Sequence, residues 1–279
     1  MKTKLIFHIL LVCSIAFFTT GCTNFFFQPN HIVYSSPSTW NKNARIIQVT
    51  TKDGTKLAHW FFPSSNPKGT VFFLHGNAQN VSSHVRNVAW LADHGYNVLL
   101  FEYRGFGQNL GEPDLKKTME DIVTTFRNIQ TIPDIAGKPV ILFGQSLGAS
   151  ITLYIATTKN IKRHLCAVIA ESPFSDYRTI VREKLSSHWL TWLFQYPLLL
   201  TINDAYSPEK RVGDITPVHL LIIHSKNDEI VPIHHGKTLF KKAEQPKEFW
   251  ETTGRHIAFL KSKSGQKRFL SYLSTVCAQ

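Results

Sequence analysis

The stretch that decides the fold runs from Phe143 to Gly148 and reads Phe-Gly-Gln-Ser-Leu-Gly. It contains the one G-x-S-x-G pentapeptide of the chain, with Ser146 at its centre, between an apolar run at residues 138–143 and a helical pattern from about residue 147 to 158. A serine on a sharp strand-to-helix turn has a strained backbone, and its neighbours must be small to avoid clashes. Gly144 and Gly148 meet this need. The pattern therefore predicts a nucleophilic serine where a buried strand ends.

Strand-like and helix-like segments alternate on both sides of this turn. Apolar runs that predict strands lie at residues 70–75, 97–103, 138–143, 166–171, 218–224 and 248–252. Helical patterns follow them, including one that carries Val85, Val88, Ala89 and Ala92 and ends at Gly95. Asp53-Gly54 joins two β-like runs, residues 45–51 and 56–62, and is a strong hairpin signal. Repeated βα alternation predicts the α/β fold class, with a mostly parallel twisted sheet, helices on both faces and the hairpin as an antiparallel edge.

An aromatic-rich excursion at about residues 174–206 interrupts this alternation. It is long enough for two short helices and contains Trp192 and Phe194. One hypothesis is a lid wall that binds an acyl chain or rests on a lipid surface, and these two side chains are its candidate substrate contacts. The alternative is an apolar face that packs on the sheet.

A serine hydroxyl needs a base to become a nucleophile, and the base needs a carboxylate to fix its tautomer. The candidate base is His256, on a loop between the last predicted strand and the last helix. The candidate acid is Asp228, just past the strand at residues 218–224, where parallel strands present their carboxyl ends. Glu229 and Glu171 are rival acids. The alternative for His256 is an ordinary surface-loop histidine.

Two backbone N–H groups must converge on the oxyanion that forms during acyl transfer. The N–H of Leu147, directly after the serine, is one candidate. The other is the N–H of Asn77, in the turn that follows the strand at residues 70–75, where Gly76 allows a tight turn. An ordinary glycine turn with a helix cap is the alternative at this position.

Several of these motifs, in this order, resemble the α/β-hydrolase superfamily over roughly residues 45–275. The motifs that carry the resemblance are Leu74-His75-Gly76-Asn77, Phe101-Glu102-Tyr103-Arg104-Gly105-Phe106-Gly107, Gly144-Gln145-Ser146-Leu147-Gly148, Asn227-Asp228-Glu229-Ile230-Val231-Pro232 and Gly254-Arg255-His256. The first two resemble the small membrane-tethered branch related to the α/β-hydrolase domain-containing lipases and the S33-like "serine aminopeptidase" sequences. By this resemblance the nucleophile, acid, base and oxyanion strip fall on Ser146, Asp228, His256, Asn77 and Leu147.

The resemblance implies a metal-free serine hydrolase without a cofactor, which acts on carboxylic esters or thioesters. The substrate would be a small-molecule ester or a lipid, and we expect a monomer. A peptidase or amidase of the same fold remains an alternative, as does a catalytically idle binding protein of the cell envelope. Fold kinship alone does not choose among them.

The first residues are typical of a targeting segment. Lys2 and Lys4 precede an apolar stretch at residues 5–18, which is short for a span and typical of a signal peptide. Thr19-Thr20-Gly21-Cys22 resembles a bacterial lipobox, although a threonine stands where leucine is preferred. We expect a lipoprotein signal peptide at residues 1–21, lipid attachment at Cys22, a tether at residues 22–44 and one domain at residues 45–279. An uncleaved anchor or ordinary secretion are alternatives, and all three place the domain outside the cytoplasm. A lipid on Cys22 would hold it at a membrane of the bacterial cell envelope.

Composition narrows the class of protein further. Of 279 residues, 43% are hydrophobic and 18% charged, which is ordinary globular usage and argues against a disordered chain or a coiled coil. The net charge is +12, but the basic residues are scattered and no nucleic-acid motif is present, so we expect no nucleic-acid partner. The simpler interpretation of this positive charge is a basic surface exposed to solvent, and contact with anionic lipid headgroups is the alternative. Cys166 and Cys277 could pair, but two buried thiols is the interpretation that we favour.

Overall fold

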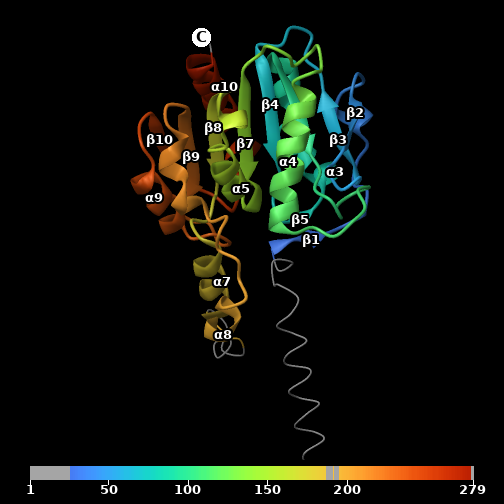
Figure 1. Ribbon diagram of the computed structural model, residues 1–279. Helices are drawn as coiled ribbons and strands as arrows, with labels where there is room; N and C mark the ends of the chain where they lie inside the picture. Colours follow the sequence, from blue (N-terminus) through green and yellow to red (C-terminus); the bar gives the residue numbers. More distant parts are fainter. Residues whose placement is uncertain (1–25, 187–190, 192–194, 278–279) are drawn as a thin grey trace, which may run out of the picture.

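A twisted eight-stranded sheet forms the centre of the computed structural model, which describes residues 26–186, 191 and 195–277 (Figure 1). Its strands, in spatial order, are β10 (Lys247–Thr252), β9 (His219–Ser225), β8 (Leu165–Glu171), β7 (Val140–Gln145), β4 (Gly69–Leu74), β6 (Tyr96–Phe101), β3 (Lys56–Phe62) and β2 (Arg45–Thr50). Neighbours from β10 to β6 are parallel, whereas β3 runs antiparallel to both β6 and β2. The predicted α/β fold class and its antiparallel hairpin edge are confirmed.

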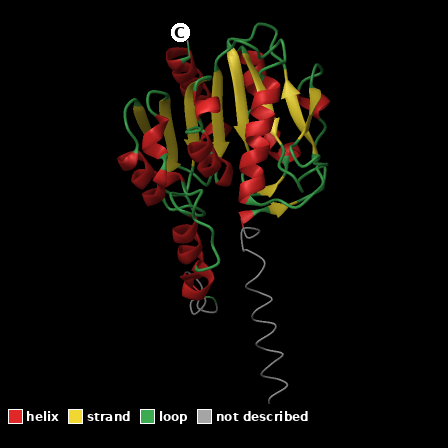
Figure 2. Cartoon of the chain, in the orientation of Figure 1, coloured by secondary structure: helices red, strands yellow, loops and turns green. Residues whose placement is uncertain are grey.

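Helices cover both faces of this sheet (Figure 2). One face packs against α4 (Leu115–Ile129), α5 (Leu147–Ile155) and α9 (Ile233–Lys242), and the other against α3 (Val81–His84) and α10 (Lys263–Val276). Every residue of β4, β6 and β7 is buried, which explains why these strands read as continuous apolar runs rather than as alternating ones.

The segment before β6 differs from the single helix that its pattern predicts. After α3, the chain continues as two 3₁₀ segments, η2 (Val85–Asn87) and η3 (Ala89–His94). The predicted end is correct, because Gly95 has a φ of 89° and closes the last turn. The apolar side chains still face the sheet, so tertiary packing, rather than regular helical geometry, stabilises this segment.

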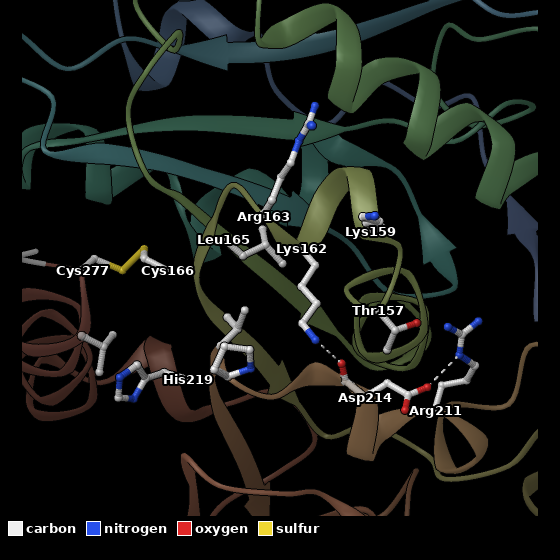
Figure 3. A pocket seen from close by; sticks show the side chains of 13 residues that line it. Thr157, Lys159, Lys162, Arg163, Leu165, Cys166, Arg211, Asp214, His219 and Cys277 are labelled. Atoms are coloured by element: carbon white, nitrogen blue, oxygen red, sulfur yellow. Dashed lines mark hydrogen bonds and ion pairs between the residues drawn. A yellow bond between two sulfur atoms is a disulfide. The ribbon is translucent and has the colours of Figure 1, made fainter.

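A disulfide joins Cys166 on β8 to Cys277 at the end of α10 (Figure 3). The Cα atoms are 5.3 Å apart and the sequence separation is 111 residues. The favoured interpretation of two separate buried thiols is therefore wrong. The sequence could not show this pairing, since it depends on how the last helix packs against the start of β8.

The segment predicted as an irregular tether packs against the domain from residue 26 onward. Phe26 and Phe27 are buried, and β1 (Gln28–Pro29) forms a two-stranded parallel pair with β5 (Ala78–Gln79). The ring of Phe26 lies edge-on to that of Tyr177, with their centroids 4.8 Å apart. The described chain therefore begins close to the turn that follows β4. Residues 1–21 and Cys22 lie outside the described residues.

The excursion after β8 contains the two short helices expected from its length, α7 (Tyr177–Ser186) and α8 (Gln195–Leu199). Both project from the body of the molecule at the edge where the parallel strands end (Figure 1). Tyr196 and Leu200 are 67% and 84% exposed, whereas Leu185 and Leu199 pack against the core, so the lid wall and the packed apolar face both stay predictions. Trp192 and Phe194 lie outside the described residues. Among the described residues, no helix combines the length and apolar character that crossing a membrane requires.

Candidate active site

Ser146 occupies the sharp turn between β7 and α5. Its backbone has a φ of 55° and a ψ of −119°, a strained conformation for a residue other than glycine. A Cβ at Gly144 would lie 2.2 Å from the carbonyl oxygen of Gly148, and a Cβ at Gly148 would lie 2.2 Å from that of Leu74. The small neighbours predicted from the pentapeptide are therefore a steric requirement of this turn.

His256 and Asp228 form a hydrogen-bonded pair at the same edge of the sheet. The Nδ1 atom of His256 lies 2.8 and 2.9 Å from the two carboxylate oxygens of Asp228. The Asp228 side chain is fully buried, and its Oδ1 also accepts hydrogen bonds from the N–H groups of Ile230 and Val231. An ionised carboxylate only accepts, so Nδ1 carries a proton and Nε2 of the neutral imidazole is left with its lone pair. This is the tautomer that a general base requires.

The charge of Asp228 is stabilised by these contacts. Burial alone would raise the pKa of the carboxyl group, but the hydrogen bond and electrostatic attraction from His256, with the N–H of Val231, outweigh burial and hold the pKa at about 2. Asp228 is therefore ionised at neutral pH.

The two rival carboxylates have other partners. Glu229 is exposed and accepts from the Nε of Arg255 and from the backbone N–H of His256, so it contacts the loop rather than the ring. Glu171 is buried at the end of β8 and accepts from the side chain of Gln145. Neither is hydrogen-bonded to the imidazole of His256, and both residues are within the described part of the chain.

Ser146 and His256 share an edge of the sheet because β7 and β10 run parallel and end there. Within the described residues, the Ser146 hydroxyl and the His256 ring make no hydrogen bond. Catalytic hydrogen bonds of this kind commonly tighten only when substrate is bound. The structure therefore joins two of the three predicted catalytic side chains directly and places the third at the same edge.

The predicted oxyanion strip lies against the serine. A Cβ at Gly76 would be 3.5 Å from the Cβ of Ser146, so the turn after β4 passes directly beside it. The N–H of Leu147 stands at the first position of α5, where no acceptor exists within the helix. Neither this N–H nor that of Asn77 donates to another of the described residues. Both are available for an oxyanion.

A cavity of about 110 Å³ adjoins this turn and is mainly apolar. Its described lining residues are Phe26, Asn77, Ser146, Leu147, Phe174, Ile180, Val181, Lys184, Ile230 and Val231. Phe26 and Lys184 were not predicted as site residues. The apolar Phe25-Phe26-Phe27 run was the only signal for Phe26, and nothing in the sequence placed Lys184 of α7 beside the serine.

A larger cavity, of about 710 Å³, lies at the opposite edge of the sheet, where β8 and β9 begin (Figure 3). The Cys166–Cys277 disulfide forms part of its wall, and Lys162 and Arg211 both reach Asp214 there. It contains none of the predicted site residues. The larger of these two cavities is therefore not the one that adjoins Ser146.

Glu183, His234 and His235 form a cluster of the residue types that bind metals. The Nε2 atoms of the two histidines lie 3.2 and 3.1 Å from the Glu183 carboxylate oxygens. The backbone N–H of Ser175 donates to Nδ1 of His235, which leaves the proton of the neutral ring on Nε2, facing Glu183. Burial lowers the pKa of His235 to about 4 and keeps the ring neutral. The cluster therefore fits a hydrogen-bonded contact between α7 and α9.

Three comparisons relate the chain to known proteins. Residues 65–199 match the family model described as serine aminopeptidase, S33. The chain is 32% identical over 249 residues to YfhR of Escherichia coli (strain K12), an uncharacterized protein, covering 87% of this chain and 82% of YfhR. It is 30% identical over 237 residues to lysophosphatidylserine lipase ABHD12 of Danio rerio, covering 77% of this chain and 58% of that protein. The Pyrococcus furiosus esterase Pf2001 superposes with a TM-score of 0.71 at 21% identity, covering 90% of this chain and 100% of the esterase, and shows a shared fold.

Proposed function

Because this chain belongs to the α/β-hydrolase superfamily, we propose that it is a serine hydrolase that cleaves carboxylic esters or thioesters through an acyl-enzyme on Ser146. One observation carries the proposal. The buried Asp228 carboxylate accepts a hydrogen bond from the Nδ1–H of His256, at the edge of the sheet where Ser146 stands in a strained turn. This arrangement provides a base with a fixed tautomer and a partly buried candidate nucleophile at the same edge of the sheet.

The first half of the reaction forms the acyl-enzyme. The Nε2 atom of His256 takes the hydroxyl proton as Oγ of Ser146 attacks the acyl carbonyl carbon. The carbonyl π-electron pair moves to its oxygen, and the N–H groups of Asn77 and Leu147 stabilise that oxyanion. As the tetrahedral intermediate collapses, the bond to the leaving oxygen or sulfur breaks, and the imidazolium of His256 gives its proton to the departing alcohol or thiol.

The second half returns the enzyme to its starting state. Water gives a proton to His256 and attacks the acyl-enzyme carbonyl, which forms a second oxyanion in the same place. Collapse of this intermediate breaks the bond to Oγ, and the proton returns from His256 to Ser146. The net reaction consumes one ester and one water and gives one acid and one alcohol. Asp228 stays ionised throughout and stabilises the imidazolium.

The lining of the 110 Å³ cavity favours an acyl substrate over an aminoacyl one. An aminopeptidase commonly uses a carboxylate to bind the substrate ammonium group. The described residues that line this cavity include a single charged side chain, Lys184, and it is cationic. The name of the matched family model keeps a peptidase or amidase as the second candidate, but the described lining residues include no carboxylate that could bind an ammonium group. The printed name of the ABHD12 relative makes a lipid ester a reasonable first substrate to test.

We further propose that a lipid on Cys22 anchors the protein outside the cytoplasm, at a bacterial envelope membrane. The lipobox-like Thr19-Thr20-Gly21-Cys22 supports the anchor, and the contact of Phe26 with Tyr177 would place the active edge near the lipid surface. Mass spectrometry of the mature N-terminal peptide from the native host tests this. We expect a diacylglycerol mass on Cys22 and loss of membrane association in Cys22→Ala. An unmodified cysteine in the membrane fraction would contradict the anchor.

Fluorophosphonate labelling with peptide mapping tests the enzymatic proposal. We expect the label on Ser146, and Ser146→Ala should lower p-nitrophenyl ester turnover by about 10⁴–10⁶-fold. Ser274→Ala, on the exposed side of α10, is the matched control and should change nothing. Parallel assays with an aminoacyl amide separate esterase from amidase. A folded Ser146→Ala protein with full ester turnover would refute the proposal, and failure of the probe to label the folded wild type would favour an idle binding protein.

A further inference from the structure

A buried histidine precedes the oxyanion strip and is bound to a buried glutamate. Nδ1 of His75, at the end of β4, lies 2.7 Å from the carbonyl oxygen of Gly76. Its Nε2 lies 3.0 Å from Oε1 of Glu102, and both side chains are buried. Both residues belong to motifs that carry the family resemblance, but neither was predicted as a site residue. The pair reaches the oxyanion strip through the carbonyl oxygen of Gly76.

Counting donors and acceptors limits the protonation states of this pair. A carbonyl oxygen only accepts, so Nδ1 of His75 must carry a proton to bond with Gly76. The remaining choice lies between an imidazolium with an ionised Glu102 and a neutral imidazole with a protonated Glu102. The neutral pair avoids placing two charges out of water, and the carboxyl O–H then donates to Nε2.

The surroundings favour the neutral pair. Burial raises the pKa of Glu102 to about 8 and lowers the pKa of His75 to about 3. The ring of His84 stacks on that of His75, and burial lowers its pKa to about 3 as well, so it adds no charge. The hydroxyl of Tyr103 donates to the His75 carbonyl, and the N–H of Val81 donates to Oε2 of Glu102.

Two further charged groups lie near the glutamate. His31 interacts with it weakly through space. Arg104 follows Glu102 by two positions in the sequence, but its guanidinium is bound to Asp121 and Asp53 instead. Among the described residues, a protonated His75 is therefore the one cation that could form an ion pair with Glu102.

We infer that Glu102 acts, in its protonated form, as a positioning residue for the oxyanion hole through His75; this rests on the proposed function. The carboxyl O–H donates to Nε2, and the Nδ1–H holds the Gly76 carbonyl on the His75 side. In a trans peptide the carbonyl and the following N–H point in opposite directions. Fixing the Gly76 carbonyl therefore turns the Asn77 N–H away from His75, and Asn77 lines the cavity that contains Ser146.

Ionisation of Glu102 would break this arrangement. Without its proton, the carboxylate faces the lone pair of Nε2 and repels it. The imidazole can satisfy the carboxylate only by moving its proton to Nε2, which releases the Gly76 carbonyl. The oxyanion hole then loses a fixed donor, so kcat should fall as the pH rises through about 8, with KM little changed.

Glu102→Gln separates this role from a merely structural one. The glutamine amide can donate to Nε2 and accept from the Val81 N–H, but it cannot ionise. We measure kcat and KM for an ester between pH 6 and 10, per active site labelled with fluorophosphonate. Wild type should lose kcat above about pH 8, whereas Glu102→Gln should retain most of its kcat at pH 7 and lack this alkaline loss. Glu102→Leu should lose about 10²–10³-fold in kcat at every pH, because the Asn77 donor is no longer fixed.

Two controls keep the result interpretable. Glu120→Gln, on the exposed face of α4, should follow the wild-type profile. The infrared difference spectrum between wild type and Glu102→Gln should show the C=O stretch of a protonated carboxylic acid at pH 7, and that band should vanish at pH 10; the difference isolates Glu102 from other buried carboxyl groups with a raised pKa, such as Glu171. This band requires no activity, so it tests the protonation even if Glu102→Leu folds poorly.

Three results would overturn the inference. One is an alkaline loss in Glu102→Gln equal to that of wild type. Another is a loss of kcat at pH 7 in Glu102→Gln that is as large as the loss in Glu102→Leu. Such a loss would indicate an imidazolium paired with an ionised Glu102, because an amide cannot neutralise an imidazolium. The third is the absence of the infrared band. Wild type that fails to label or to hydrolyse esters would instead refute the proposed function, and the positioning role with it.

Discussion

Asp228→Asn should inactivate the protein while leaving its active-site geometry in place. The asparagine oxygen can occupy the position of Oδ1 and keep the hydrogen bonds from the N–H groups of Ile230 and Val231, which are both 2.9 Å long. Its amide nitrogen must then face Nδ1 of His256, where the carboxylate now accepts at 2.8 Å. Because an amide NH₂ only donates, it repels a proton on Nδ1 at this distance and favours the tautomer with the proton on Nε2, even though the oxygen at the Oδ1 position lies 2.9 Å from Nδ1. The ring would then present a proton, rather than a lone pair, to Ser146.

The magnitude follows from this loss of the base. Where a triad aspartate is replaced by asparagine and the geometry persists, the rate falls by about 10⁴-fold. At about 1.36 kcal/mol for each factor of ten, this is about 5.4 kcal/mol of transition-state stabilisation. The pKa of Asp228 is held at about 2, so wild type keeps its ionised acid over the whole neutral range.

The assay is kcat/KM for a p-nitrophenyl ester at pH 7.5, with far-UV circular dichroism and a urea midpoint to verify folding. Glu229→Gln is the matched control, because this carboxylate follows Asp228 directly but contacts Arg255 and the backbone N–H of His256. We expect less than a tenfold change in that variant. Activity of Asp228→Asn within tenfold of wild type would refute the reasoning. An equal loss of kcat/KM in Glu229→Gln would also refute it, because Glu229 would then share the role of the acid.

Three further predictions concern the framework of the site. Replacing Cys166 and Cys277 with alanine should lower the free energy of unfolding by about 2–5 kcal/mol, measured by urea denaturation, since the crosslink restricts the unfolded chain over 111 residues; two titratable thiols in the native protein would contradict this. Gly148→Ala should abolish ester turnover or folding, because its Cβ would lie 2.2 Å from a carbonyl oxygen of β4, and normal kcat would show that the turn tolerates a side chain. Arg104→Leu should destabilise the protein by about 3–5 kcal/mol in the same denaturation assay, because it leaves Asp121 buried without its cation; a loss below 1 kcal/mol would show that this carboxyl is protonated or solvated.

Local patterns predicted the parts of the fold that depend on neighbouring residues in the sequence. The Asp53-Gly54 hairpin, the strand before Ser146 and the helix after it all formed within three residues of their predicted bounds. The order of elements, with the right-handed crossover rule for parallel strands, was then enough to place Asp228 and His256 at the edge where Ser146 lies.

Other features depended on contacts between distant segments. Cys166 and Cys277 are separated by 111 residues, and their pairing follows from how α10 packs. The burial of Phe26 beside Tyr177 placed part of the predicted tether at the site. No local sequence pattern predicts either contact, because the sequences of these segments are equally compatible with contacts to other parts of the chain.

The sequence by itself determined the order of the strands and helices, the strained serine turn and the identity of the candidate acid and base. Only the tertiary structure decided which proton each buried group carries. The charge of Asp228 and the proton of Glu102 differ because one carboxylate meets a donating imidazole and backbone N–H groups, whereas the other meets an accepting nitrogen with no described cation. A carboxyl group has the same chemistry at both positions in the sequence. Its protonation is set by burial and by the groups across the fold that face it.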